Sequence, residues 1–333
     1  MVQKSNKILK TCIMVIRLIL AGLAIVATIM LFKLRLWPFE LFHHFVLHLF
    51  LGTFLLIVAC LVFRAKLEVV LFSSLFIIFG ILLWDAYGSP RVSQASVTKL
   101  PDNYQEQFIS LTIMTHNVKD ANKQHQQLGL WLQSQPADVV LLQEVPSKIA
   151  AWYRDMRIYP YQLEVYDPAL NHPNFPDDKA IVILSKHPVS GDMAYKPFKE
   201  ARPVPLVRID LPDAQDPWVV IIDALEPKSA ELLERRDRML LKSTATIREL
   251  NGPVVAAGDF NATPFTPVFK EFLKAADLSA SGFYIPTYPT KLKWFGIPID
   301  HILVRNIPVK SIEALPTIGS DHHPLKAELL ILR

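Results

Sequence analysis

The sequence has few cysteines, no internal repeat and no excess of charge beyond its N-terminal quarter. Cys12 and Cys60 are the two cysteines, so the chain after residue 60 has neither a disulfide framework nor a cysteine metal site. Residues 1–90 carry eight of the 35 Lys and Arg and three of the 31 Asp and Glu, which leaves 27 against 28 for the remainder. The formal charge of +4 therefore belongs to the N-terminal part. A remainder near neutrality lacks the net positive charge that non-specific nucleic-acid binding usually needs, with a local basic patch as the alternative.

Three long apolar runs occupy this N-terminal part, at about 11–32, 42–63 and 67–84. Each is close to the roughly 20 residues that a helix needs to cross a bilayer, which predicts a membrane anchor of three transmembrane helices over 1–84. The alternatives are a cleaved signal peptide for the first run and buried core helices for the others. A core helix would show a polar stripe, which these runs lack.

Basic residues near the apolar runs predict the orientation of the chain. Lys4, Lys7 and Lys10 precede the first run, and Arg64 and Lys66 separate the second from the third. Positively charged flanks tend to stay on the cytoplasmic side, although the loop after the first run is also basic. We therefore expect a multi-pass cell membrane protein whose C-terminal part is periplasmic or extracellular.

The composition changes after the third run. Residues 85–108 are polar and without periodicity, which indicates a linker. Apolar runs typical of strands then alternate with helical patterns, which predicts an α/β domain over 109–333 with sheets buried between helices. The expected strands are 109–118, 137–145, 179–186, 205–211, 218–225, 253–261, 300–304 and 325–332, and the expected helices are 123–135, 229–250 and 265–276.

Several of these strands end in a polar side chain suited to phosphate or metal chemistry. They are Asn117, Glu144, Asp223, Asp259 and Asn261. In α/β folds, ligands collect at the carboxyl ends of strands. One such residue alone is more often a turn or cap residue, so the argument rests on their repetition.

Six motifs together resemble a known superfamily. In chain order they are THNV (115–118), DVVLLQEV (138–145), AIVILSKHPV (180–189), GDFNATP (258–264), IDHILV (299–304) and GSDHHPL (319–325). Their order and spacing are similar to those of the endonuclease/exonuclease/phosphatase superfamily over essentially all of 109–333. The resemblance implies a four-layer α/β/β/α sandwich that cleaves phosphoesters with a divalent metal, usually Mg²⁺, with Mn²⁺ as the alternative. The apolar N-terminus looks most like the bacterial membrane-anchored, VanJ-like branch.

The resemblance also implies roles for individual residues. Glu144 looks like the principal metal ligand, with Asn117 on the metal or on a phosphate oxygen and Asp321 near the metal. One firm carboxylate and few protein neighbours suit Mg²⁺, which keeps several waters. The alternative for Glu144 is a surface charge at a strand end.

The catalytic set implied by the resemblance is Asp259, Asn261, Asp300 and His322. Asp259 orients or deprotonates the attacking water or protonates the leaving oxygen, and Asn261 binds the developing charge. His322 is the expected general base, with Asp300 fixing its tautomer. Adjacent residues on an extended segment point to opposite faces, so His323 is expected to face away. His323 and His301 are expected to be structural.

One position departs from the family pattern. Many members end the strand equivalent to 218–225 in a histidine that contacts the scissile phosphate, and here Asp223 or Ala224 occupies that position, depending on the alignment. An ionised aspartate cannot donate to phosphate. The change predicts either an altered or slower enzyme, or one that uses a basic residue such as Lys228 or Arg236, with Asp223 lining the substrate site.

These observations favour a membrane-anchored, metal-dependent phosphohydrolase. Because the anchor would hold the site beside membrane lipids, a lipid-linked phosphate or pyrophosphate is the preferred substrate. A nuclease would use the same catalytic set, but nucleic acid is the less favoured partner because of the charge of the outer domain. A non-catalytic binding or scaffold module is the second alternative.

Overall fold

The structure is a computed structural model that describes residues 2–88, 104–134, 137–166, 179–199, 201–280, 282 and 284–333. The chain divides into two compact units. Residues 1–89 and 265–267 form the first, and 90–264 with 268–333 form the second, which we call the sandwich unit. Most of the predicted linker lies outside the described residues.

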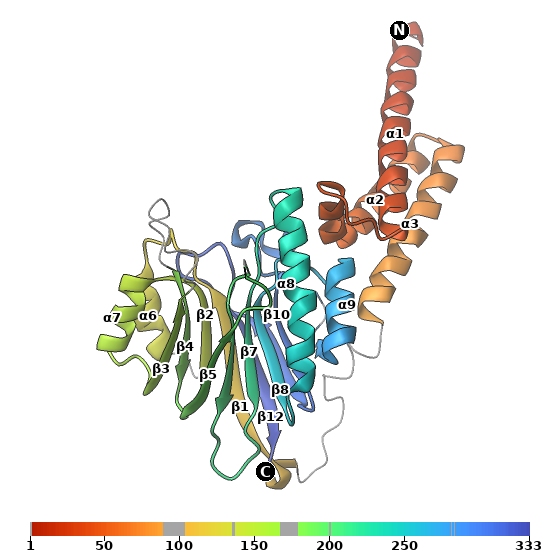
Figure 1. Cartoon of the computed structure of the whole chain (residues 1–333). Helices are drawn as coiled ribbons and strands as arrows, with labels where there is room; N and C mark the ends of the chain where they lie inside the picture. The colour runs from red at the N-terminus through yellow and green to blue at the C-terminus, as the bar shows by residue number, and fades with distance from the viewer. Residues whose placement is uncertain are drawn as a thin grey trace. The chain divides into compact units, whose positions relative to one another are not determined.

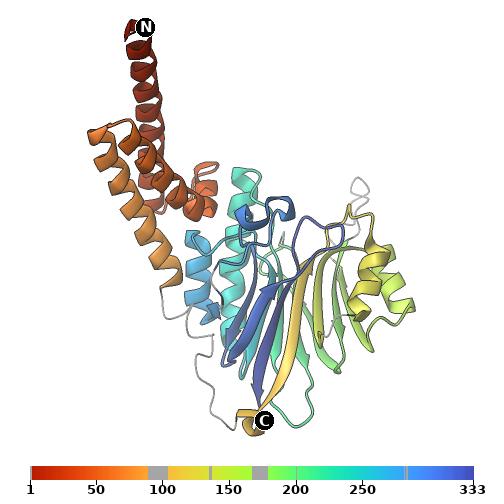
Figure 2. The ribbon, with the colours of Figure 1, turned by 180° about the vertical axis from the view of Figure 1, so that it is seen from behind.

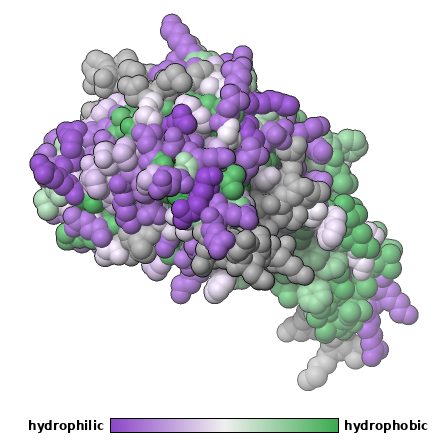
Figure 3. All heavy atoms as spheres, turned by 90° about the horizontal axis from the view of Figure 1, so that it is seen from below, coloured by the Kyte–Doolittle hydropathy of each residue, from purple (hydrophilic) through white to green (hydrophobic). Residues whose placement is uncertain are grey.

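The first unit contains the predicted membrane helices. Its elements are α1 (Val2–Leu31), η1 (Phe39–Phe45), α2 (Val46–Val62) and α3 (Lys66–Tyr87). Three stretches are long and apolar enough to cross a membrane, at Thr11–Leu31, Phe39–Val62 and Lys66–Tyr87. Hydrophobic residues gather on the surface of these helices, whereas hydrophilic residues dominate the visible face of the sandwich unit (Figure 3). Apolar side chains turned outward in this way are stable in lipid rather than in water.

The sandwich unit is built from two mixed sheets of six strands each. Their strand orders are β11-β12-β1-β2-β4-β3 and β5-β6-β7-β8-β10-β9. In each sheet the central pair is parallel, β1 with β2 and β7 with β8, and the remaining pairs are antiparallel. The strands of the first sheet are β1 (Phe108–Asn117), β2 (Val139–Pro146), β3 (Tyr161–Tyr166), β4 (Lys179–Ser185), β11 (Val309–Ala314) and β12 (Leu325–Leu332). Those of the second are β5 (Val189–Tyr195), β6 (Val204–Ile209), β7 (Trp218–Asp223), β8 (Val254–Asp259), β9 (Ser279–Ala280) and β10 (Asp300–Arg305).

The core lies between the two sheets. Alternate residues of both sheets share one buried cluster, which joins Ile113 and Leu141 of the first to Ile221 and Ala257 of the second. The other face of the first sheet packs on helices α6 (His125–Ser134) and α7 (Ser147–Asp155). Helices α8 (Ala230–Glu249) and α9 (Pro267–Ala276) lie along the second sheet (Figures 1 and 2). The strands are therefore apolar on both faces, as their continuous apolar runs predicted.

In the sandwich unit the predicted elements were correct in kind, and their bounds differ from the prediction by at most two residues. Among the described residues of the sandwich unit, the elements that escaped prediction are α5 (Tyr104–Gln107), α7, β3, β5, β9, η3 (Thr290–Phe295) and β11. Helix α8 begins where Ser229 Oγ accepts a hydrogen bond from the backbone N–H of Leu232 at 3.2 Å, as an N-cap should. The α/β/β/α sandwich and the three apolar helices agree with the sequence-based prediction.

Candidate active site

The polar strand ends meet at one edge of the sandwich. Because β1 and β2 are parallel, as are β7 and β8, each pair ends together. Strand β10 runs antiparallel to β8, so its first residue, Asp300, pairs with the last residue of β8, Asp259. The loop before β12 reaches the same edge, because β12 is antiparallel to β1. Residues separated by more than 200 positions thus come together.

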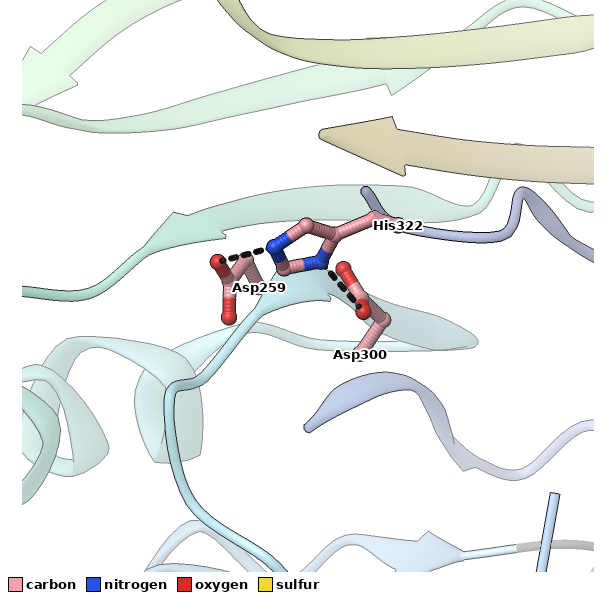
Figure 4. Close-up of side chains that lie close together, drawn as sticks. All are labelled: Asp259, Asp300 and His322. Atoms are coloured by element: carbon pink, nitrogen blue, oxygen red, sulfur yellow. Dashed lines mark hydrogen bonds and ion pairs between the residues drawn. The ribbon is translucent and has the colours of Figure 1, made fainter. Parts of the chain in front are cut away.

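Three buried side chains form the centre of this edge. His322 Nδ1 donates to Asp300 Oδ2 at 2.9 Å, and His322 Nε2 lies 4.0 Å from Asp259 Oδ2 (Figure 4). The imidazole therefore points one nitrogen at each carboxylate. The Tyr288 ring packs on the imidazole with 4.8 Å between ring centroids. The predicted pair of Asp300 and His322 is present as a hydrogen-bonded unit.

The backbone of the His322 loop is fastened to β1. Ser320 Oγ donates to the carbonyl of Asn117 at 2.7 Å and accepts from the backbone N–H of His322 at 3.0 Å. Thr287 Oγ1 accepts from the backbone N–H of Asp300 at 3.2 Å. These bonds fix both members of the His–Asp pair through buried hydroxyl groups, which limits how far either can move.

Two asparagines surround the carboxylate of Asp259. Asn117 Nδ2 donates to Asp259 Oδ2 at 3.1 Å, and Asn261 donates to the same carboxylate through its backbone N–H at 2.8 Å and its Nδ2 at 3.2 Å. Asn261 adopts a left-handed conformation with φ 47°, which asparagine tolerates better than most residues. Both amides are thereby held beside the position that Asp259 occupies.

Arg236 supports this arrangement through the backbone of Asn261. Its side chain is completely buried, and Nη1 donates to the carbonyl of Asn261 at 2.8 Å while Nη2 binds Asp237 at 2.7 Å. The expectation that Arg236 contacts substrate is therefore wrong in this structure. A guanidinium with no exposed surface cannot reach a ligand, and its effect passes through Asn261.

Glu144 lies in a bulge of β2. The register of β2 against β4 shifts between Leu142 and Val145, and Glu144 adopts φ 59°. A left-handed conformation costs a glutamate roughly 1–2 kcal/mol, and such strain concentrates at functional sites. Its Oε2 lies 3.3 Å from Lys179 Nζ, which also binds Asp120 at 2.8 Å.

Asp321 and Asp223 are also paired with basic groups. Asp321 Oδ2 accepts from Lys119 Nζ at 2.6 Å. Asp223 lies 2.6 Å from Arg202 Nη1, and together they line a small cavity with Lys179. Arg202 stands just before β6, which pairs antiparallel to β7, so it enters the edge where β7 ends. Arg202 therefore supplies positive charge beside Asp223.

The sequence analysis missed this basic group. Lys228, which was expected there, pairs instead with Glu226 and has a 67% exposed side chain. The signal that could have identified Arg202 was the antiparallel hairpin of β6 and β7, because it places the start of one strand beside the end of the other. Lys119, Lys179 and Tyr288 carried no motif of their own.

The protonation of the central group follows from its burial and charges. Burial by itself would lower the pKa of His322, but the charge and hydrogen bond of Asp300 outweigh it and raise this pKa to about 10. The same contact outweighs burial at Asp300 and lowers its pKa. Burial, followed by the charge of Asp300, raises the pKa of Asp259 to about 8. At neutral pH His322 is thus an imidazolium, which is not the neutral base expected from its ordinary pKa.

The site also fits a divalent cation chemically. Among the described residues, Asp259, Asp300 and His322 offer ligand atoms that all lie within 4.8 Å of one another. The hydrogen bond between Asp300 and His322 occupies two of these atoms, however. Glu144 and Asp321, the metal-binding carboxylates expected from the sequence, each face a lysine ammonium group. These carboxylates attract cations, and a metal there would have to displace or rearrange the lysines.

The other two histidines near the site bind backbone carbonyls. His301 Nε2 lies 2.8 Å from the carbonyl oxygen of Ala262, and His323 Nδ1 lies 3.0 Å from that of Leu315. His323 therefore does not share an ion with His322. Both contacts are of the structural kind that the sequence analysis expected.

Comparison with known proteins identifies the family. The model of the Endonuclease/Exonuclease/phosphatase family matches residues 114–322, which include every strand-end residue described above. The chain belongs to this family. One curated relative is a UPF0294 protein of Klebsiella pneumoniae (strain 342), which is 30% identical to this chain over 170 residues. That match covers 48% of this chain and 60% of the relative. A UPF0294 protein of Vibrio parahaemolyticus is 33% identical over 81 residues, and the match covers 28% of its length. The matches thus span less than two thirds of the length of these relatives.

Solved structures show that the sandwich unit has the family fold. An endonuclease/exonuclease/phosphatase from Beutenbergia cavernae aligns with TM-score 0.55 and 18% identity, over 67% of this chain and 72% of that one. Sphingomyelinase C from Streptomyces griseocarneus aligns with TM-score 0.51 and 18% identity, over 66% and 99% of the two chains. A Neisseria 3′ phosphatase bound to a DNA hairpin aligns with TM-score 0.51 and 17% identity, over 65% and 98%. At these identities the likeness concerns the fold.

Proposed function

We propose that this family member is a membrane-anchored, divalent-metal-dependent phosphohydrolase that acts on a lipid-linked phosphate or pyrophosphate. The observation that carries the proposal is the buried group of Asp259, Asp300 and His322 in a chain that also has three apolar helices. The N-terminal Lys residues favour an orientation that places the sandwich unit in the periplasm or outside the cell.

In this proposal, water attacks phosphorus in line with the leaving oxygen, and the P–O bond to that oxygen breaks. Asp259, in its carboxylate form, accepts a proton from the attacking water, and the leaving oxygen takes up a proton from solvent. A carboxyl group with a pKa of about 8 is near the working pH, which is the condition for efficient proton transfer. His322, held as an imidazolium by Asp300, donates through Nε2 to the phosphoryl oxygens, where negative charge develops.

Further groups position the substrate. The amides of Asn117 and Asn261 hold the Asp259 carboxylate and stand beside the reacting phosphate. Arg202 beside Asp223 supplies the positive charge that the family's usual histidine would bring. Glu144, with Asn117 and Asp321, would hold Mg²⁺ or Mn²⁺, which when bound neutralises charge on the phosphoryl group.

The decisive experiment is an assay of the full chain, purified in detergent with Mg²⁺, against undecaprenyl pyrophosphate, sphingomyelin and plasmid DNA. Wild type should hydrolyse a lipid substrate. His322→Ala should lose activity, whereas His323→Ala should keep it, because the imidazole of His323 binds the backbone carbonyl of Leu315 and not a catalytic side chain. Cleavage of DNA alone would contradict the lipid assignment and favour a nuclease. A folded wild type that hydrolyses none of the three would point to a binding or scaffold module.

Orientation needs its own measurement. A reporter fused after Arg333, such as alkaline phosphatase, is active only outside the cytoplasm. The alkaline phosphatase fusion is expected to be active. If instead a reporter that works only in the cytoplasm were active when fused after Arg333, the proposed orientation would be contradicted.

A further inference from the structure

One loop of the sandwich unit exposes apolar and basic side chains in direct succession. Residues Lys291–Phe295 (KLKWF) within η3 (Thr290–Phe295) are all exposed. Trp294 is 86% exposed, and Leu292 is 52% exposed. Elsewhere among the described residues of this unit, large exposed apolar side chains stand singly, at Leu130, Met156, Tyr161, Tyr166 and Leu332. We call 291–295 the KLKWF loop.

The base of the KLKWF loop is rigidly held. Tyr288 and Ile297 form a bridge, in which the backbone N–H of Tyr288 donates to the carbonyl of Ile297 at 3.1 Å. Tyr284 Oη donates to the carbonyl of Gly296 at 2.7 Å. A side chain at Gly296 would come within 2.9 Å of the Tyr288 carbonyl oxygen. The exposed tip is therefore presented by a fixed stem, and its exposure is not a consequence of a loose backbone.

The same stem is joined to the catalytic loop. The backbone N–H of Thr290 donates to the carbonyl of Asp321 at 2.9 Å, and that of His323 donates to the carbonyl of Thr287 at 2.8 Å. Tyr288 packs on the ring of His322. Whatever surface the KLKWF loop contacts is thus brought beside the catalytic residues.

We propose that the KLKWF loop docks the sandwich unit on the surface of an anionic bilayer, with Trp294 and Leu292 entering the interface and Lys291 and Lys293 contacting lipid phosphates. Tryptophan favours the membrane–water interface because its ring is apolar and its N–H is polar. A lysine near an anionic surface also stabilises binding. The three apolar helices of the same chain keep a bilayer within reach.

Docking goes beyond the proposed hydrolysis, since it names the bilayer itself as a partner of the sandwich unit. It would hold the catalytic edge against lipid headgroups and so favour substrates embedded in the membrane over dissolved ones. The docking measurement needs no substrate. Its failure can therefore be told apart from failure of the proposed activity.

The test uses the full chain in vesicles that contain phosphatidylglycerol, with Cys12→Ala and Cys60→Ala removing the native thiols. An environment-sensitive fluorophore is attached at Leu292→Cys or, as the matched control, at Asp213→Cys. Asp213 is exposed in the turn before β7 and so lies at the opposite edge from the site, roughly 20 Å away along a six-residue strand. Lipids with brominated acyl chains should quench the label at 292 and leave that at 213 unquenched.

Charge reversal tests the basic part of the proposal. Lys291→Glu with Lys293→Glu should shift the equilibrium toward the undocked loop by more than about 30-fold on anionic bilayers, because loss of the two positive charges alone accounts for about 30-fold and the two new negative charges add repulsion. Equal quenching at 292 and 213 would overturn the proposal. The proposal would also be overturned if the label at 292 were shielded from aqueous iodide but not quenched by brominated lipid, because a protein surface would then cover the loop.

An activity ratio gives a second readout. Leu292→Ser with Trp294→Ser should lower turnover of a vesicle-embedded phosphoester several-fold and leave turnover of soluble bis(4-nitrophenyl) phosphate unchanged. Both residues lie outside the catalytic group, so a parallel loss on both substrates would show damage to the site and contradict the docking role.

Discussion

Replacement of Asp300 by asparagine separates the charge of this residue from its shape. Asp300 and His322 are 2% and 6% exposed and share a 2.9 Å hydrogen bond. The asparagine Oδ1 can still accept from His322 Nδ1, so the ring should keep its orientation. What disappears is the negative charge that keeps the imidazole protonated.

The size of the effect can be judged within the same protein. His301 is about as buried, and its bonded acceptor is a backbone carbonyl; burial lowers its pKa to about 4. His322 in Asp300→Asn would resemble His301, with Asp259 at 4.0 Å and the more distant effect of Asp321 as the remaining acidic influences. We therefore expect the pKa of His322 to fall from about 10 to below its usual 6.5.

Loss of the imidazolium should lower kcat by about 10²–10⁴, the usual contribution of a positioned proton-transfer or charge-stabilising group. The free energy of unfolding should fall by less than is usual when a buried ion pair is broken. Removing one partner of a buried ion pair costs about 3–5 kcal/mol when the other charge is stranded, but this imidazole can release its proton.

Two measurements check this prediction on the full chain in detergent micelles. Nitrogen-15 histidine spectra, assigned with His322→Gln, give the pKa of His322, and hydrolysis of bis(4-nitrophenyl) phosphate gives kcat. Asp213→Asn, an exposed carboxylate at the opposite edge, is the control and should change neither. If Asp300→Asn left the pKa near 10 or kept wild-type turnover, the assignment of Asp300 as the charge that holds His322 would be wrong.

Three further predictions concern other parts of the site. Gly258→Ala should prevent assembly of the β7–β8 edge, because at φ 141° its Cβ would lie 1.8 Å from a β7 carbonyl oxygen, whereas Gly252→Ala, with open space, should cost only about 1–2 kcal/mol in thermal unfolding. His301→Gln should reduce the destabilisation of the fold by acid. The pKa of His301 is about 4 in the folded protein and about 6.5 in the unfolded chain, so the free energy of unfolding of wild type should fall by about 3 kcal/mol as the pH drops from 6.5 to 4. The variant should not show this loss. Calorimetric titration should show tighter Mg²⁺ binding in Lys179→Gln and weaker binding in Glu144→Gln. The reason is that Lys179, 3.3 Å from Glu144, competes with the metal for this carboxylate. Unchanged affinity in both variants would mean that Glu144 does not bind the metal.

Local patterns were enough to predict most of the fold. Continuous apolar runs bounded by turn residues revealed the long central strands, and the uninterrupted runs before residue 88 revealed the three apolar helices. The short edge strands β3, β5 and β11 escaped because each is half-exposed or has an interrupted pairing register. A strand at a sheet edge buries little, so its sequence carries little signal.

The functional residues divide in the same way. Asp259, Asp300 and His322 stand in recognisable motifs, so the sequence alone indicated them, and the motifs also led to the family. Arg202 and Lys179 stand in no such motif, and only the antiparallel hairpin and the β2 bulge bring them to Asp223 and Glu144. The position of a charge across a sheet depends on strand pairing, which a local pattern does not encode.

The sequence by itself determined the family and the presence of three helices apolar enough for a membrane, and it indicated the candidate catalytic side chains. Tertiary structure decided the protonation of His322, since its pKa depends on burial and on Asp300, 22 positions away. It also decided that Arg236 supports Asn261 from within the fold, and that Trp294 is exposed beside the catalytic loop. Burial and the distances between charges arise only when the two sheets pack together, which is why residue order alone could not supply them.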